Sequence, residues 1–161
     1  MKFLPKAVKR GFTLIELLVV IGVLTILLAI VLVAINPARQ FSQANDTQRR
    51  SDVNATLNAI HQYAADNKGV LPAGITTTTK TITSTVGATN VDLCADLVPK
   101  YLADLPFDPT TGTESPANSI CTDVGATYDT KYTVVRSATD SRLTITATPE
   151  ITPPSTITVT R

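Results

Sequence analysis

The sequence is poor in the residue types on which most enzyme active sites depend. Among its 161 residues there is one histidine, His61, and no tryptophan. A Gly-x-Ser-x-Gly elbow, a glycine-rich phosphate loop and a His-Glu-x-x-His helix are all missing. Any serine or threonine nucleophile would therefore lack an evident base. These absences argue against an enzyme, and we expect no catalytic residues.

Cysteine is also scarce, which argues against the usual zinc sites. The two cysteines, Cys94 and Cys121, show no Cys-x-x-Cys spacing, and His61 is distant from both in the sequence. In an oxidising compartment the pair would close a loop of about 28 residues as a disulfide, worth roughly 3–4 kcal/mol in the chain-entropy model. Two buried free thiols are the alternative. We expect His61 to flank an apolar helix face rather than to bind a metal.

Charge is nearly absent from one long stretch near the N-terminus. Between Arg10 and Asn36 the only charged residue is Glu16, and the segment from Phe12 to Ile35 is mostly apolar. Its roughly 24 residues are enough for a helix to cross a bilayer. This pattern predicts a transmembrane helix over residues 12–36.

The charges before this helix predict its orientation. Residues 1–11 contain Lys2, Lys6, Lys9 and Arg10 and no acid. Basic residues beside a membrane span stay in the cytoplasm, so the rest of the chain should face outward. The whole chain has a formal net charge of +1, but without this segment ten basic and thirteen acidic residues remain, which gives −3. That balance offers no support for nucleic-acid binding.

Gly11 has an unusual position for a small residue at a cleavage site. A secretory signal peptide is cut after its apolar core, which removes the core. Here the small residue follows the basic pair Lys9-Arg10 and precedes the apolar stretch. A cut between Gly11 and Phe12 would leave the helix in the mature chain. The sequence thus favours a short leader over residues 1–11 and a membrane helix that is retained.

The stretch Lys-Arg-Gly-Phe-Thr-Leu-Ile-Glu-Leu-Leu-Val-Val-Ile, residues 9–21, resembles the class III leader junction of type IV prepilins and pseudopilins. The resemblance implies that a prepilin peptidase cuts after Gly11 and that the new amino group of Phe12 is methylated. It also implies a homo-oligomeric filament with a core of bundled helices. The implied partners are minor pilins, an assembly platform protein and its cytoplasmic ATPase. No cofactor is expected, apart from the calcium ion considered below.

Glu16 is costly in its predicted place, because a carboxylate in hydrocarbon costs about 2.5–3.5 kcal/mol or more. Cleavage would create a cationic amine on Phe12, four residues earlier on the same helix face. Pairing with this amine, in the same chain or a neighbour, would remove much of the cost. Glu16 would then fix the register at which subunits assemble. The alternative is an incidental glutamate that reaches the aqueous interface.

Beyond the membrane span, the pattern predicts that the helix continues through residues 37–68 as an amphipathic segment. Pro37 would kink it at the lipid boundary, and Lys68-Gly69 would end it. Residues 42–52 have almost no apolar face, so we expect a solvated link there. Four residues then form an apolar stripe: Val53, Leu57, Ile60 and Ala64.

The remaining residues, 69–161, should form a small β-rich domain. Residues 76–85 are rich in threonine and indicate a surface loop or a weak edge strand, and residues 92–105 indicate one or two helical turns. Three runs alternate as strands do: 131–136, 142–148 and 155–160. We expect an antiparallel sheet that packs on the apolar stripe of the helix. The result would be the α+β pilin fold that the resemblance implies.

The long loop between Pro106 and Tyr132 carries several acidic residues. They are Asp108, Glu114, Asp123 and Asp129. Some pseudopilins hold a calcium ion in this region, and carboxylate oxygens suit calcium. The chain lacks the regular Asp-x-Asp-x-Asp-Gly spacing, so a solvated acidic loop is the preferred interpretation.

Three functions are compatible with this organisation. We favour a structural subunit of a type IV pilus-like filament, anchored in the cell membrane with a cytoplasmic N-terminus before assembly and periplasmic or extracellular afterwards. The stretch Leu-Val-Pro-Lys-Tyr-Leu at 97–102 resembles major pseudopilins and favours a type II secretion pseudopilin that forms a periplasmic piston, whereas the loop 108–112 departs from that family. A single-pass membrane receptor or adhesin with an exposed β domain is the third, and it requires neither Gly11 nor Glu16.

Overall fold

The computed structural model describes residues 11–117, 119–151 and 156–161. Ten of the eleven residues of the predicted leader, 1–10, lie outside the described residues. The chain divides into two compact units, Met1–Gln40 and Phe41–Arg161, which are described in turn.

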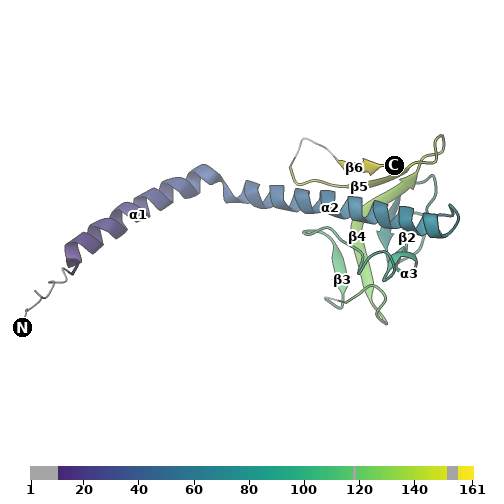
Figure 1. The fold of residues 1–161 in the computed structure, drawn as a ribbon, viewed down its shortest axis with the longest axis horizontal. Coiled ribbons are helices and arrows are strands. Elements are labelled where there is room, and N and C mark those ends of the chain that lie inside the picture. Colours follow the sequence, from purple (N-terminus) through teal and green to yellow (C-terminus); the bar gives the residue numbers. More distant parts are fainter. Residues whose placement is uncertain (1–10, 118, 152–155) are drawn as a thin grey trace, which may run out of the picture. The chain divides into compact units, whose positions relative to one another are not determined.

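The first unit contains one apolar helix, α1 (Leu14–Ile35), which has 22 residues and is drawn in purple to blue in Figure 1. At 1.5 Å per residue it is about 33 Å long, close to the hydrocarbon thickness of a bilayer. None of its residues is buried by the rest of the chain. α1 is thus long and apolar enough to cross a membrane. It begins two residues later than predicted, because Thr13 has an extended backbone and forms the N-cap.

The helix is interrupted at Asn36 instead of being kinked. Asn36 has a left-handed backbone, with φ 47° and ψ 79°, and it ends α1. The next helix, α2 (Pro37–Asp66), begins at Pro37, where the missing N–H of proline has no cost because first-turn amides have no helical partner. The side-chain oxygen of Asn36 accepts a hydrogen bond from the Arg39 amide at 3.4 Å, as an N-cap does. The expected continuous helix is therefore wrong at this residue.

The end of α2 lies close to the predicted position. The helix ends at Asp66, and Lys68 and Gly69 both have left-handed backbones, with φ of 57° and 87°. The Gly69 amide donates to the Ala64 carbonyl at 2.7 Å, which closes the last turn.

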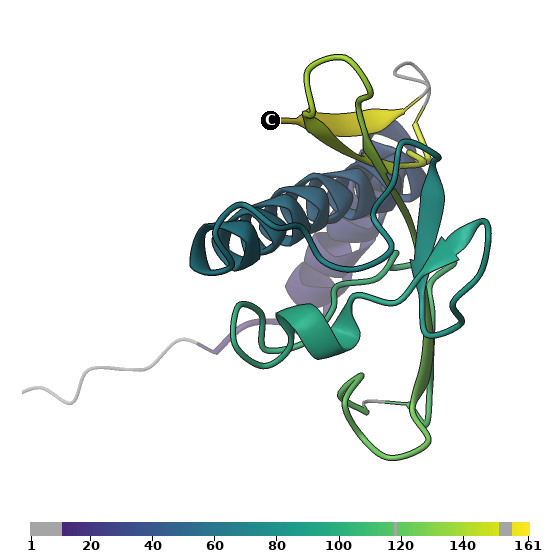
Figure 2. The same cartoon turned by 90° about the vertical axis from the view of Figure 1, so that its right-hand side faces the viewer.

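The second unit contains a sheet that covers α2 (Figure 2). The strand order is β2-β1-β4-β5-β6, and β3 pairs with the N-terminal end of β4, residues 127–129. All described pairings are antiparallel except β1 with β2. The strands are β1 (Lys80–Thr83), β2 (Asn90–Val91), β3 (Thr113–Ser115), β4 (Thr127–Arg136), β5 (Leu143–Ala147) and β6 (Ile157–Thr160), and a short helix, α3 (Cys94–Leu97), precedes β3.

β1 corrects one expectation. The threonine-rich run was expected to be a loop or a weak edge strand, yet β1 lies inside the sheet between β2 and β4. Ile82 is 1% exposed, and its carbonyl accepts a hydrogen bond from the Thr130 hydroxyl at 2.8 Å. A single apolar residue among threonines gave too weak a pattern, and pairing on both sides decided the position of the strand.

The core forms where the apolar stripe of α2 meets the inner face of the sheet. Val53, Leu57 and Ile60 are fully buried, whereas Ala64 is half-buried. Val53, Leu57 and Ile60 belong to one cluster with buried residues from the strands, including Ile82, Tyr132, Val134, Leu143 and Ile145. The α+β architecture is therefore confirmed, and so are three of the four residues of the helix stripe; Ala64 lies outside the core cluster.

Candidate processing and assembly site

The predicted cleavage junction lies outside any helix or strand and is exposed. Gly11 and Phe12 precede α1, and the Phe12 side chain is 91% exposed. A Cβ added at Gly11 would meet no atom within 4 Å. Packing within the described chain therefore does not require glycine at this position.

Glu16 is held by the start of its own helix. One oxygen of its carboxylate accepts hydrogen bonds from the Thr13 amide at 2.9 Å and the Thr13 hydroxyl at 2.8 Å. In return, the Glu16 amide donates to the Thr13 hydroxyl at 3.3 Å. This is a capping box, and the N-terminal end of the helix dipole also favours a carboxylate there. The carboxylate thus has partners before any amine is created.

The capping box changes two sequence-based expectations. Phe12 lies before the N-cap Thr13, so Phe12 and Glu16 do not share a helix face in this uncleaved chain. Thr13 itself was not among the predicted site residues. Its signal was present in the sequence, since Thr-x-x-Glu before an apolar run is the capping-box pattern.

The rest of α1 offers an apolar surface on every side. Apart from Glu16, its one polar side chain is Thr25, whose hydroxyl donates to the Gly22 carbonyl at 2.8 Å. Both polar side chains are thus satisfied within the helix. A helix of this kind suits lipid or a bundle of similar helices.

A buried charge cluster lies on the first half of α2, where a solvated link was expected. Arg49 is 2% exposed, and Asp46 and Asp52 are 7% and 5% exposed. The Arg49 guanidinium binds Asp108 through two hydrogen bonds of 2.6 and 3.0 Å. It also donates to Asp46 at 2.8 Å and to Glu150 at 3.0 Å. The expectation of a solvated link is therefore wrong.

Arg49 and its three carboxylate partners, called the Arg49 cluster below, join distant segments of the chain. One carboxylate oxygen of Asp46 accepts the Glu150 amide at 2.8 Å and the other accepts the Ile151 amide at 3.1 Å. Asp108 accepts the amides of Thr110 and Thr111 at 2.9 and 2.8 Å. The cluster thus fastens the 108–111 turn and the segment after β5 to α2.

The pKa values of these carboxyl groups follow their partners. Burial raises the pKa of Asp108, but hydrogen bonds from Arg49 and from two backbone amides outweigh it and hold the pKa well below its usual range. Burial likewise opposes the backbone amides and Arg49 at Asp46, where the pKa is again lowered. At Asp52 burial prevails over hydrogen bonds from Tyr132 and Gln48, so the pKa of Asp52 is raised.

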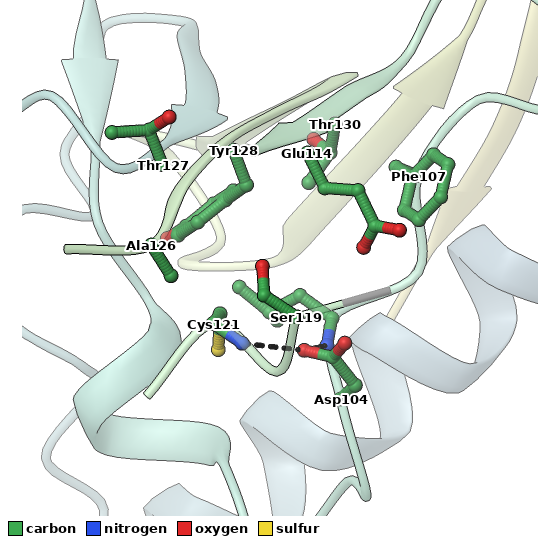
Figure 3. A pocket seen from close by; sticks show the side chains of 10 residues that line it. Asp104, Phe107, Glu114, Ser119, Cys121, Ala126, Thr127, Tyr128 and Thr130 are labelled. Atoms are coloured by element: carbon green, nitrogen blue, oxygen red, sulfur yellow. Dashed lines mark hydrogen bonds between the residues drawn. The ribbon is translucent and has the colours of Figure 1, made fainter. Parts of the chain in front are cut away.

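The acidic loop residues do not gather as a cation site. Asp108 is 3% exposed and engaged by Arg49, so it does not belong to a solvated loop as expected. Asp129 forms an ion pair with Lys131, and Asp123 accepts the Ile120 amide at 2.9 Å. Glu114 lies across a hollow of about 10 Å³ from Asp104, which accepts the Cys121 amide at 3.1 Å (Figure 3). Among the described residues, no group of three or more histidine, cysteine, aspartate or glutamate residues is placed to hold a metal ion.

The other predicted site residues lie in the second unit. Cys94 and Cys121 form a disulfide, with Cα atoms 5.9 Å apart, that ties α3 to the loop before β4. His61 lies on α2 beside Ile60 and is half-buried. Its Nε2 atom is buried and has no hydrogen-bond partner in the described part of the chain.

The comparisons with known proteins bear on the N-terminal part alone. No curated protein and no solved structure matches the chain significantly. Residues 6–32 match the family model described as a prokaryotic N-terminal methylation motif. The matched segment contains Gly11, Phe12, the capping box and most of α1. A leader of this class implies processing by prepilin peptidase and assembly into filaments, and it supports a prepilin of the type IV pilin and pseudopilin kind.

Proposed function

We propose that this chain is a structural subunit of a type IV pilus-like filament, cleaved after Gly11 and methylated on Phe12. The observation that carries the proposal is the methylation motif, residues 6–32, which spans an exposed junction and an apolar helix with one capped glutamate. The subunit itself does no chemistry and is the substrate of the peptidase and the methylating activity.

Glu16 has a defined part in this proposal. In the uncleaved chain its carboxylate is held by Thr13, which limits the cost of placing it near hydrocarbon. Cleavage creates an amine at Phe12, and each carboxylate oxygen can accept more than one hydrogen bond. An amine of a neighbouring subunit then pairs with Glu16 at one axial offset, while other offsets leave both charges unpaired in an apolar core.

The surroundings of the subunit follow from the same proposal. The basic leader keeps the N-terminus in the cytoplasm, and α1 anchors the precursor in the membrane until assembly. The partners are further copies of the chain, minor pilins, prepilin peptidase and an assembly platform with its ATPase. After assembly the second unit is exposed in the periplasm or outside the cell. Neither a cofactor nor nucleic acid takes part.

Processing is tested by intact-mass and N-terminal peptide analysis of protein from its native membrane. We expect a chain that begins at Phe12 and is heavier by one methyl group. Gly11→Val should leave the precursor uncut. Gly22→Val is the matched control, since added Cβ atoms at both glycines meet nothing within 4 Å and only Gly11 adjoins the cut. A chain from the native membrane that still begins at Met1, or normal cleavage of Gly11→Val, would refute processing at this site.

The role of Glu16 is tested by counting filaments on cells that produce Glu16→Ala. We expect filaments to be lost although the precursor is inserted and cleaved, because the carboxylate acts at assembly. Glu16→Gln keeps the size of the side chain and tests whether the charge itself is needed. Normal filaments from both variants would refute the register role of Glu16.

A type II secretion pseudopilin is the second candidate, favoured by the 97–102 segment that resembles major pseudopilins. In the structure this segment forms the end of α3 and the turns after it. The two candidates share processing and assembly and differ in filament length. Imaging of filaments beyond the cell envelope separates them, since a periplasmic piston does not project from the cell.

A further inference from the structure

One pentapeptide pattern occurs three times in the sheet. Thr-Ile-Thr-x-Thr is found at residues 81–85, 144–148 and 156–160, which cover parts of β1, β5 and β6. The isoleucine of each repeat is buried, with exposures of 1% at Ile82, 0% at Ile145 and 4% at Ile157. Each of the three strands therefore turns its isoleucine to the core. In β5 and β6 the threonines beside that isoleucine lie on the other face of the sheet, whereas Thr83 of β1 is only 8% exposed.

The neighbours of the three strands differ. β1 and β5 each have a strand on both sides, whereas β6 is the last strand of the sheet. Leu143 and Arg161 exchange two backbone hydrogen bonds, of 2.7 and 3.0 Å. In an antiparallel ladder the bonding direction alternates, so the N–H and C=O groups of Thr158 and Thr160 point away from β5. In the described residues, no strand pairs with this outer edge of β6.

The edge of β6 has little protection against strand addition. Edge strands of monomeric proteins usually carry lysine, proline or a bulge that blocks pairing. The four residues of β6 are all β-branched and uncharged, and Thr158 and Thr160 are exposed. β6 thus has the composition of an interior strand and lies at an edge.

We propose that β6 of one copy pairs antiparallel with β6 of a second copy. The occupant follows from the repeat, because β6 carries the pattern of the strand that already pairs with it. In the β5·β6 pair, Ile145 lies opposite Val159 and Thr146 opposite Thr158. If a second β6 takes the register of β5, Thr158 lies opposite its own copy and Ile157 lies opposite Val159 of the other copy.

This register satisfies both faces of the joined sheet. Thr158 has its backbone groups at the free edge, so the two copies of Thr158 form a hydrogen-bonded pair on the two-fold axis. Ile157 and Val159 share the inner face and extend the apolar row across the axis. On the outer face threonine meets threonine, as Thr144 meets Thr160 within one copy, where the hydroxyls are 2.8 Å apart. The contact is isologous and closes one edge of each sheet.

Disulfide trapping in the full chain in detergent micelles tests the pairing. Cys94 and Cys121 are joined to each other, so an introduced cysteine is the only free thiol. We expect Thr158→Cys to give a disulfide-linked dimer under mild oxidation, because hydrogen-bonded partners have Cα atoms about 5.5 Å apart. The matched control is Thr146→Cys, on the same face one strand inward, whose two copies would be separated by about three strand spacings, or roughly 14 Å.

Mixing two variants tests the register. Thr156→Cys and Thr160→Cys should each give little dimer alone, because Thr156 of one copy lies opposite Thr160 of the other. A mixture of the two should give the mixed dimer. The proposal is overturned if Thr158→Cys links no better than Thr146→Cys, or if Thr160→Cys alone links as well as the mixture. The pairing needs neither cleavage nor Glu16, so its failure leaves the filament proposal untouched.

Discussion

α1 and the first half of α2 show opposite relations between residue chemistry and exposure. α1 is almost entirely apolar, yet none of its residues is buried by this chain. Residues 42–52 are almost entirely polar, yet three charged side chains among them are buried. The difference lies in where the partners are. Under the proposed function the partners of α1 are lipid or other copies of the chain, whereas those of Arg49 come from distant parts of the same chain.

The largest expected effect comes from removing the cation of the Arg49 cluster. Arg49→Met leaves Asp46, Asp108 and Glu150 without their common cation. Because two of these carboxylates are buried, we expect a loss of about 3–5 kcal/mol in the free energy of unfolding. Urea unfolding of the full chain in detergent, followed by near-ultraviolet circular dichroism of the tyrosines, measures this loss.

Arg50→Met is the matched control for that experiment. Arg50 is the next residue on α2 and its side chain is exposed, so its replacement should change the free energy of unfolding by no more than about 0.5 kcal/mol. Equal unfolding of the two variants would show that the Arg49 cluster does not stabilise the fold.

Acid should weaken the Arg49 cluster and leave α1 helical. The pKa values of Asp46 and Asp108 are lower in the folded state than their ordinary values. Their stabilisation is therefore complete above the unfolded-state pKa, about 3.9, and is lost as the pH falls through the folded-state values. Asp52, whose pKa is raised, contributes with the opposite sign, because its protonation relieves the cost of a buried charge.

The measurement is the free energy of unfolding between pH 7 and pH 2. We expect a decline below about pH 4 that is shallower in Asp108→Asn, because this variant has one depressed carboxyl fewer. An unchanged free energy of unfolding down to pH 2 in the unmodified chain would contradict this prediction.

The smallest expected effect concerns the start of the apolar helix α1, where Thr13 caps the helix. Thr13→Val keeps the shape of the side chain and removes the hydroxyl that bonds Glu16 in both directions. Loss of an N-cap costs about 1 kcal/mol, so the Glu16 amide should exchange its hydrogen about fivefold faster in the uncleaved chain in micelles. Thr25→Val is the control, because its hydroxyl bonds one carbonyl inside the same helix and caps nothing. Equal exchange at Glu16 in both variants would show that the capping box does not hold the start of α1.

Much of the fold followed from patterns within short windows of sequence. The length of α1, the stripe of Val53, Leu57 and Ile60, and the alternation of β4 and β5 each depend on spacing along the chain, which a sequence displays directly. β1 could not be predicted in this way, because its one buried apolar side chain, Ile82, shows no alternation of apolar and polar residues. β1 became an interior strand because β2 and β4 pair with it.

The Arg49 cluster could not be derived in the same way. A polar helix segment is compatible with solvent unless charges of opposite sign arrive from elsewhere. The carboxylates of Asp108 and Glu150 are 59 and 101 residues away in the sequence. Nothing local to Arg49 distinguishes it from the exposed Arg50, and the difference arises only from the contacts that Arg49 makes with distant segments.

The sequence by itself determined the apolar helix, the methylation motif with its glutamate, and the helix that carries the core, because each is a local pattern of residue chemistry. The tertiary structure alone decided which charges are buried, the interior place of β1, and the exposure of a strand with interior composition at the edge of the sheet. These properties depend on which segments meet in space. Burial of a charge or a strand edge is favourable only when the partner is already in place.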